Sequence, residues 1–188
     1  MQGKVYKMTL VSMFAVLTII GALIKFQTPL VPFSLQIFFV ILSGLILGSK
    51  LGFLSQIVYI AIGLTGIPVF TGGGGLGYIF KPTFGYILGF AAAAFITGKI
   101  KEKFDSENIT YKSLLFSSFV GIVSCYVLGV SYLYMHYKLI QGVNTDIAKV
   151  LTSGFLIFLP WDIIKIAAAS WVAREVMKRV GVFKIQEI

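Results

Sequence analysis

Two opposite charges stand three residues apart in an apolar stretch of the sequence that is otherwise uncharged. Asp162 and Lys165 lie between Val150 and Ala173, and no other side chain in that stretch is charged. Residues three apart in a helix share one face, so we expect the two groups to lie close together. A charge at the centre of a membrane-spanning helix costs roughly 2.5 to 3.5 kcal/mol. Such residues usually face a wet cavity, so a polar substrate or ion site is expected here. The alternative is an ion pair that only holds helices together.

The composition is that of a membrane protein. Of the 188 residues, 57% are hydrophobic and 12% are charged, and the mean hydropathy is +0.93. The charged fraction is well below the usual quarter of a soluble domain. We therefore predict an all-α integral membrane protein, with a single domain over residues 1–188 and six transmembrane helices. The predicted spans are residues 8–24, 32–48, 51–67, 82–98, 114–135 and 150–173.

The basic residues report on orientation in the membrane. The formal net charge is +9, but the lysines and arginines are interleaved with the predicted spans, so binding to nucleic acid is not expected. If the amino terminus is cytoplasmic, eleven of the 16 basic residues fall inside, four fall outside, and Lys165 lies within a span. The excess of positive charge inside predicts a multi-pass protein of the cell membrane with both termini in the cytoplasm.

A glycine-rich segment, residues 66–86, joins the third and fourth predicted spans on the outer side. It reads GIPVFTGGGGLGYIFKPTFGY and is too apolar to lie free in water. Four consecutive glycines, Gly72 to Gly75, allow positive φ and close approach of other groups. We predict an extracellular lid loop or pocket wall; the alternative is a flexible hinge without ligand contact.

Several activities are excluded by what the sequence lacks. Gly72, Gly74 and Gly77 fit G-x-G-x-x-G, but no strand-helix-strand unit surrounds them, and no Lys-Ser or Lys-Thr follows to make a Walker A loop. Asp162 is the one aspartate in a predicted span, and the chain has one histidine and one cysteine, so we expect neither an enzyme nor a metal or cofactor site. Because one carboxylate can carry a proton, a proton-coupled secondary carrier for a small carboxylate is the alternative to a substrate-binding subunit.

Four stretches of the sequence together resemble one known family. They are PLVPFSLQ from Pro29, GLTGIPVFTGGGGLG from Gly63, KPTFGYILGF from Lys81 and FLPWDIIKIAAA from Phe158. This ordered set resembles the BioY family, the biotin-specific substrate-binding S components of energy-coupling factor (ECF) transporters. The resemblance implies a six-helix S-component bundle with a biotin pocket near the extracellular side. It also implies a transmembrane T component and two cytoplasmic ATPases as partners.

Biotin sets requirements that the polar residues can meet. Its ureido group donates two N–H bonds and its side chain ends in a carboxylate, so we expect Asp162 to accept from the ureido group and Lys165 to bind the carboxylate. Side chains at i and i+3 begin only about 5 to 6 Å apart, so the alternative is that both bind one end of biotin while Lys81 or backbone N–H groups of the lid bind the other. The further candidates are Gln36, Phe70, Thr71, Gly72, Gly73, Thr83, Tyr86 and Trp161.

The resemblance also implies a docking face on the first helix. S components of this type contact their T component through small residues spaced four apart on that helix. The corresponding positions here are Ser12, Ala15, Val16 and Ile19, so the pattern of small residues is incomplete.

Overall fold

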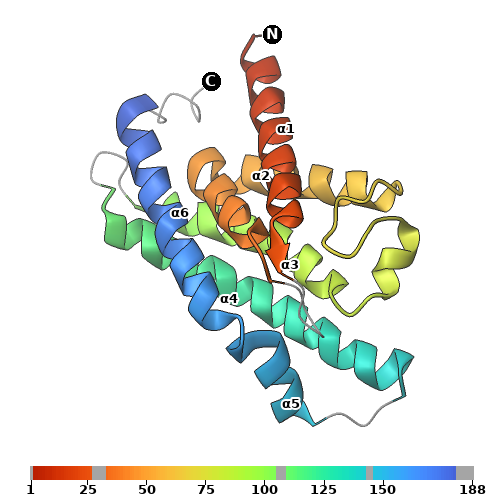
Figure 1. Ribbon diagram of the computed structural model, residues 1–188. Helices are drawn as coiled ribbons and strands as arrows, with labels where there is room; N and C mark the ends of the chain where they lie inside the picture. Colours follow the sequence, from red (N-terminus) through yellow and green to blue (C-terminus); the bar gives the residue numbers. More distant parts are fainter. Residues whose placement is uncertain (1, 27–32, 105–108, 143–145, 181–188) are drawn as a thin grey trace.

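The computed structural model describes residues 2–26, 33–104, 109–142 and 146–180. Within these ranges the protein is a helical bundle with one small β-hairpin (Figure 1). The long helices are α1 (Gln2–Leu23), α2 (Gln36–Leu64), α3 (Phe84–Lys101), α4 (Tyr111–Met135) and α6 (Leu159–Val180). The short elements are strands β1 (Lys25–Phe26) and β2 (Phe33–Ser34), the 3-10 helix η1 (Leu76–Phe80), helix α5 (Ile147–Leu151) and the π-helices η3 (His136–Ile140) and η4 (Thr152–Leu156).

Helix α2 is folded in two at Gly48. This residue has φ 81° and ψ −178°, values that no helix contains. The Gln36 side-chain amide at the start of α2 donates to the Tyr59 hydroxyl at 2.6 Å. In a straight helix, 23 residues would separate these groups by about 35 Å. The halves 36–47 and 49–64 therefore run antiparallel.

This fold of α2 joins two of the predicted spans into one bent helix. The sequence predicts separate spans at residues 32–48 and 51–67, whereas the structure joins them at one glycine without a loop. Five helical segments of the described chain are long and apolar enough to cross a membrane, and α2 is one of them. Its first half is shorter than the roughly 20 residues of a full span. Six separate full-length spans are thus not what the described residues form.

Helix α3 lies between α2 and α4 and packs closely against both (Figure 1). At Gly98 an added Cβ would lie 2.3 Å from the Ser49 nitrogen, and at Gly89 it would lie 2.8 Å from the Cys125 carbonyl oxygen. Hydrogen at these positions lets the helix backbones touch. The Glu102 carboxylate, just after α3, accepts from the Ser49 N–H at 2.7 Å and so caps the second half of α2.

The last predicted span is bent instead of continuous. Residues 150–173 were expected to form one helix, but α5 and η4 end at Leu156, and α6 begins at Leu159 (Figure 1). Pro160 is the second residue of α6, where its missing N–H costs nothing. The break places Asp162 in the first turn of α6, and the helix dipole favours a carboxylate there.

The glycine-rich segment is folded against the bundle. Phe70 and Gly73 exchange two backbone hydrogen bonds of 2.9 and 3.1 Å, which close a tight turn with Thr71 and Gly72 at its corner. Gly73 has φ +117°, a value that L-residues rarely adopt. At Gly74 a Cβ would lie 2.2 Å from a backbone carbonyl oxygen. The prediction that this segment needs glycine is therefore explained by positive φ at Gly73 and Gly75 and by the close backbone approach at Gly74.

Candidate ligand-binding site

A cavity lies among α2, α3, α4, α6, strand β2 and the glycine-rich segment. About 590 Å³ of this region is free of protein atoms, a volume that includes space open to solvent. Its apolar lining consists of Phe33, Ile37, Ile87, Phe90, Ile122 and Phe158. Its polar lining consists of Ser34, Gln36, Thr71, Thr83, Tyr86, Cys125, Tyr126, Asp162 and Lys165. An apolar sleeve with a few polar groups suits a ligand that is polar at particular points.

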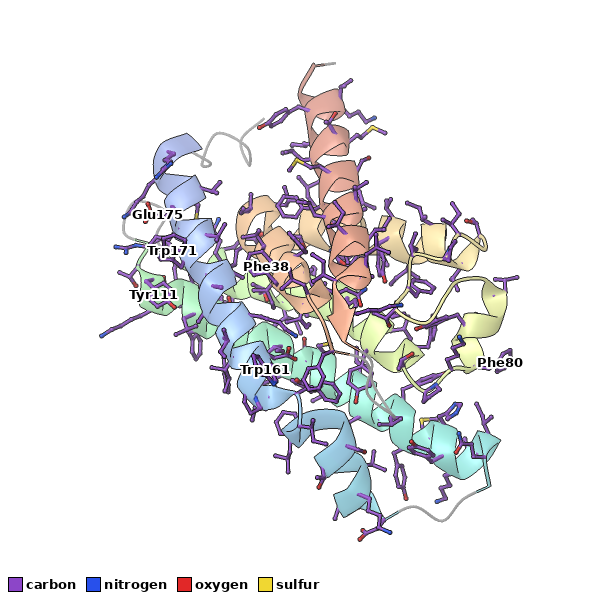
Figure 2. All side chains as sticks on the ribbon, viewed as in Figure 1. Phe38, Phe80, Tyr111, Trp161, Trp171 and Glu175 are labelled. Carbon is purple, nitrogen blue, oxygen red and sulfur yellow. The ribbon has the colours of Figure 1, made fainter. Side chains whose placement is uncertain are left out.

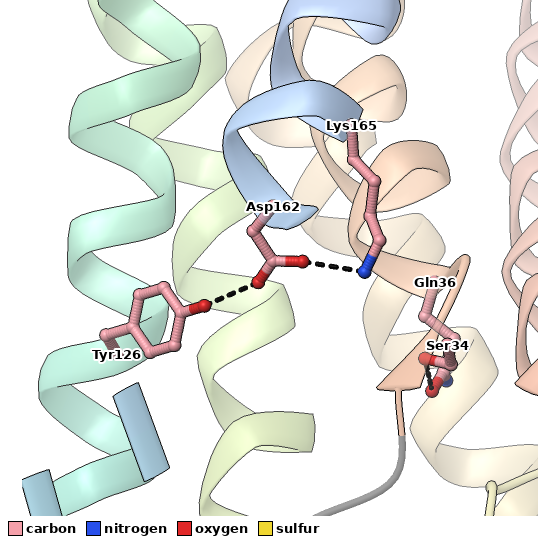
Figure 3. Close-up of polar contacts among 5 residues, drawn as sticks. All are labelled: Ser34, Gln36, Tyr126, Asp162 and Lys165. Carbon is pink, nitrogen blue, oxygen red and sulfur yellow. Dashed lines mark hydrogen bonds and ion pairs between the residues drawn. The ribbon is translucent and has the colours of Figure 1, made fainter. Parts of the chain in front are cut away.

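Asp162 and Lys165 are paired within the cavity, as their spacing on the helix predicts. The Lys165 ammonium donates to Asp162 Oδ1 at 2.7 Å (Figure 3). The other carboxylate oxygen, Oδ2, accepts from the Tyr126 hydroxyl at 2.5 Å. Asp162 is 6% exposed. Both of its oxygens are thus held in fixed directions in a buried position, and each retains a free lone pair for a further donor.

Tyr126 is a site residue that sequence reasoning missed. It comes from the middle of α4, 36 residues before Asp162, and no spacing rule connects the two positions. Its ring packs edge-on against Phe155 with 4.7 Å between centroids and faces Tyr86 at 6.4 Å. A buried tyrosine hydroxyl usually finds a partner, but the same span also contains Tyr132, Tyr134 and four serines, so this signal did not single out Tyr126.

The predicted residue Tyr86 lines the cavity with its ring and holds the neighbouring bend with its hydroxyl. That hydroxyl donates to the Gly154 carbonyl in η4 at 2.7 Å. The bond is long-range, from α3 to the π-helix that precedes α6. Tyr86 therefore helps to set where α6, and with it Asp162, begins.

A second polar group stands near β2 and the start of α2. The Ser34 hydroxyl donates to Gln36 Oε1 at 3.0 Å (Figure 3). Gln36 Nε2 in turn donates to the Tyr59 hydroxyl. Thr71 lies in the wall formed by the glycine-rich segment and is buried. Gln36 and Thr71 were both predicted as site residues, and Ser34 was not. Ser34 was overlooked because a serine beside a predicted helix start is usually a local cap.

Other predicted site residues lie outside the cavity lining. These are Phe70, Gly72, Gly73, Lys81 and Trp161. The Phe70 ring packs inside the glycine-rich segment, 4.6 Å from Tyr78, because an apolar ring there is buried best against other rings. Lys81 donates to the Gly72 carbonyl at 2.6 Å and lies over the Tyr78 ring. Trp161 is 58% exposed, like Trp171 further along α6 (Figure 2).

The predicted docking face of α1 is divided by packing. Ala15 is only 1% exposed because α1 places it against the core, beside Phe14. Val16 is 51% exposed and Ser12 is also exposed, with its hydroxyl bonded to the Met8 carbonyl. Ile19 is partly buried. Ala15 is thus packed into the core of this arrangement while Ser12 and Val16 face outward, and docking of a partner at these positions stays a prediction.

Comparison with known proteins decides the family. A family model described as the BioY family matches residues 1–182. The chain belongs to the BioY family. It is 40% identical over 177 residues to "Probable biotin transporter BioY" of Lysinibacillus sphaericus, covering 94% of this chain and 89% of that one. It is 37% identical over 168 residues to "Biotin transporter BioY" of Thermotoga maritima, covering 88% and 92%.

A solved structure agrees with this BioY assignment. The fold matches the crystal structure of the S-component for biotin from an ECF-type ABC transporter with a TM-score of 0.80, 25% identity and coverage of 94% and 93%. The family resemblance seen in the sequence is therefore confirmed, as is the S-component fold. The chain is a multi-pass membrane protein of a transporter family, not of an enzyme family. Of the motif PLVPFSLQ, residues 29–32 lie outside the described residues.

Proposed function

We propose that this chain is the biotin-binding subunit of an ECF-type uptake transporter. The main observation that supports this proposal is the Asp162–Lys165 pair, 2.7 Å apart, in an apolar cavity of a BioY-family fold. Relatives of this chain bear the name biotin transporter, and the matching crystal structure is the S-component for biotin. The ligand enters from outside and is released inside when partner subunits drive the change.

The pair fits the ureido ring of biotin better than the two ends of an extended ligand. A ureido group places its N–H donors and its carbonyl acceptor side by side. Asp162 accepts from an N–H, and Lys165 donates to the carbonyl oxygen. Tyr126 fixes the direction of the Asp162 carboxylate from the other side. The separation of only 2.7 Å between the charged atoms supports this reading over the one in which Lys165 alone serves the carboxylate.

Energy for uptake comes from other chains in this proposal. The sequence contains no Walker A loop, so a transmembrane T component and two cytoplasmic ATPases are the proposed partners. In liposomes, the protein alone should bind biotin without concentrating it. Concentrative uptake should require co-reconstituted ATPase and T subunits together with ATP, and radiolabelled biotin retained in the vesicles measures it. Concentration driven by a proton gradient in vesicles with this chain alone would favour the secondary-carrier alternative.

For the membrane topology we propose six crossings, with the halves of α2 as two of them, and both termini in the cytoplasm. The glycine-rich segment then lies outside as a lid over the cavity. Single cysteines from Gln2→Cys and Glu187→Cys, each in a Cys125→Ser background, should react with an impermeant reagent only after permeabilisation. Opposite accessibility of the two ends would instead require an odd number of crossings.

A further inference from the structure

In the part of the chain that the structure describes, the cavity lining has no positive charge free to bind the carboxylate of the ligand. Among the described residues, its lining contains two charged side chains, Asp162 and Lys165, and these neutralise each other at 2.7 Å. If biotin presents its ureido ring to this pair, its carboxylate lies at the far end of the molecule. An anion buried without a cation is penalised by several kcal/mol, so a cation is needed near that end.

Lys25 is placed to supply this charge. In the β1–β2 hairpin Lys25 is directly opposite Ser34. Side chains of directly opposed residues in an antiparallel pair leave the sheet on the same side, about 5 Å apart. Ser34 lines the cavity and contacts Gln36 there. The Lys25 side chain therefore leaves the hairpin on the side that faces the cavity.

The other end of the Lys25 side chain reaches a second wall of the cavity. Its ammonium donates to the carbonyl of Thr71, which also lines the cavity, so it bridges the hairpin and the glycine-rich segment. The side chain is partly buried. Within the described parts of the chain, no carboxylate forms an ion pair with it. An ammonium has three donors, so it can bind a carboxylate while it keeps the bond to Thr71.

Lys81 can be compared with Lys25, because its ammonium also donates to a backbone carbonyl of the glycine-rich segment, that of the residue after Thr71. It donates to the Gly72 carbonyl at 2.6 Å. Neither Lys81 nor Gly72 lines the cavity, and the Lys81 ammonium is engaged by the Tyr78 ring at 4.8 Å. Neither lysine is part of the cavity lining, but Lys25 meets two residues that are, because it pairs with Ser34 in the hairpin and donates to the Thr71 carbonyl.

We infer that Lys25 is the cation that binds the carboxylate of the ligand, an inference that rests on the proposed binding of biotin. Through its bond to Thr71 it also couples the bound carboxylate to the position of the glycine-rich segment. The protein thus binds both ends of the ligand: the Asp162–Lys165 pair on α6 binds the ureido ring, and Lys25, just after α1, binds the carboxylate. A neutral tail, such as a methyl ester, loses only the second contact.

The test compares biotin with its methyl ester on the purified full-length protein by titration calorimetry. Wild type should bind biotin at least roughly 10-fold more tightly than the ester. Lys25→Met should weaken biotin binding roughly 10- to 100-fold, the value of a hydrogen bond between charged groups, while ester binding stays near wild type. Lys25→Arg should keep part of the preference for the acid. The matched control Lys81→Met should keep all of it.

Each other outcome overturns a defined part of the inference. Equal losses of biotin and ester in Lys25→Met would show that Lys25 only supports the fold of the segment. If Lys25→Met kept the wild-type preference for the acid, Lys25 would not be the residue that binds the carboxylate. The same would hold if the preference were lost in Lys81→Met. In both cases the proposed binding of biotin would stand. A wild-type protein that binds neither compound would overturn the proposed function itself, and the assignment of Lys25 with it.

Discussion

The double variant Asp162→Asn with Lys165→Met is expected to remain folded and to lose its affinity for biotin. Removing one partner of a buried pair leaves a charge uncompensated at a cost of roughly 3 to 5 kcal/mol, so each single variant should be unstable. The double variant removes both charges at similar volume, and its thermal unfolding in detergent should return toward wild type. Binding should not recover, because two charge-assisted contacts are lost. A fall in affinity of at least roughly 100-fold is expected by calorimetry.

The same helix offers a matched control. Glu175 and Lys178 form the other i,i+3 ion pair of the described part of α6 at 3.2 Å, and their side chains are much more exposed. Glu175→Gln with Lys178→Met should change neither stability nor binding measurably, because exposed pairs contribute little. Near-native biotin affinity in a stable Asp162→Asn, Lys165→Met protein would show that the buried pair only holds helices together.

Gly73→Val should weaken biotin binding while the helical bundle stays folded. Gly73 has φ +117°, and a Cβ added there would meet open space, so the effect of valine is backbone strain rather than collision. Strain in such regions costs roughly 1 to 3 kcal/mol, which corresponds to about 5- to 150-fold in affinity if the strained turn is the one that contacts ligand. Association and dissociation rates of biotin, followed by surface plasmon resonance, measure the effect.

Gly77→Val is the control for the loop. A Cβ at Gly77 also meets open space, but its φ is not positive, so valine there should leave the kinetics close to wild type. If both variants bound biotin as the wild type does, the turn at Gly73 would have no part in binding. The glycine-rich segment would then be a hinge without ligand contact.

The sequence was most informative where contacts are local. Asp162 and Lys165 were placed together because three residues make nearly one helical turn, and the structure agrees. The long apolar run 114–135 corresponds to α4, since hydropathy over that length has few solutions other than a helix. The predicted boundary between the spans 32–48 and 51–67 lies at the reversal at Gly48, but hydropathy did not show that the two halves join there without a loop.

The rest of the site depends on contacts between distant segments. Tyr126 meets Asp162 only because α4 packs beside α6, and Lys25 meets Thr71 only because the hairpin lies against the glycine-rich turn. Composition could not tell which loop residues face inward. Phe70 was therefore assigned to the ligand although it packs against Tyr78. Lys81 was predicted to bind ligand and Lys25 was not considered, because the sequence does not show which lysine on the outer side lies near the cavity.

Cys125 is a thiol that the fold keeps out of reach. It is the only cysteine of the sequence, it lines the cavity, and it is 3% exposed, with its Sγ 3.7 Å from the Tyr86 carbonyl oxygen on the facing helix. A thiol buried in apolar surroundings is inert toward thiol reagents. Cysteines introduced at the surface can thus be labelled with little reaction at the native one.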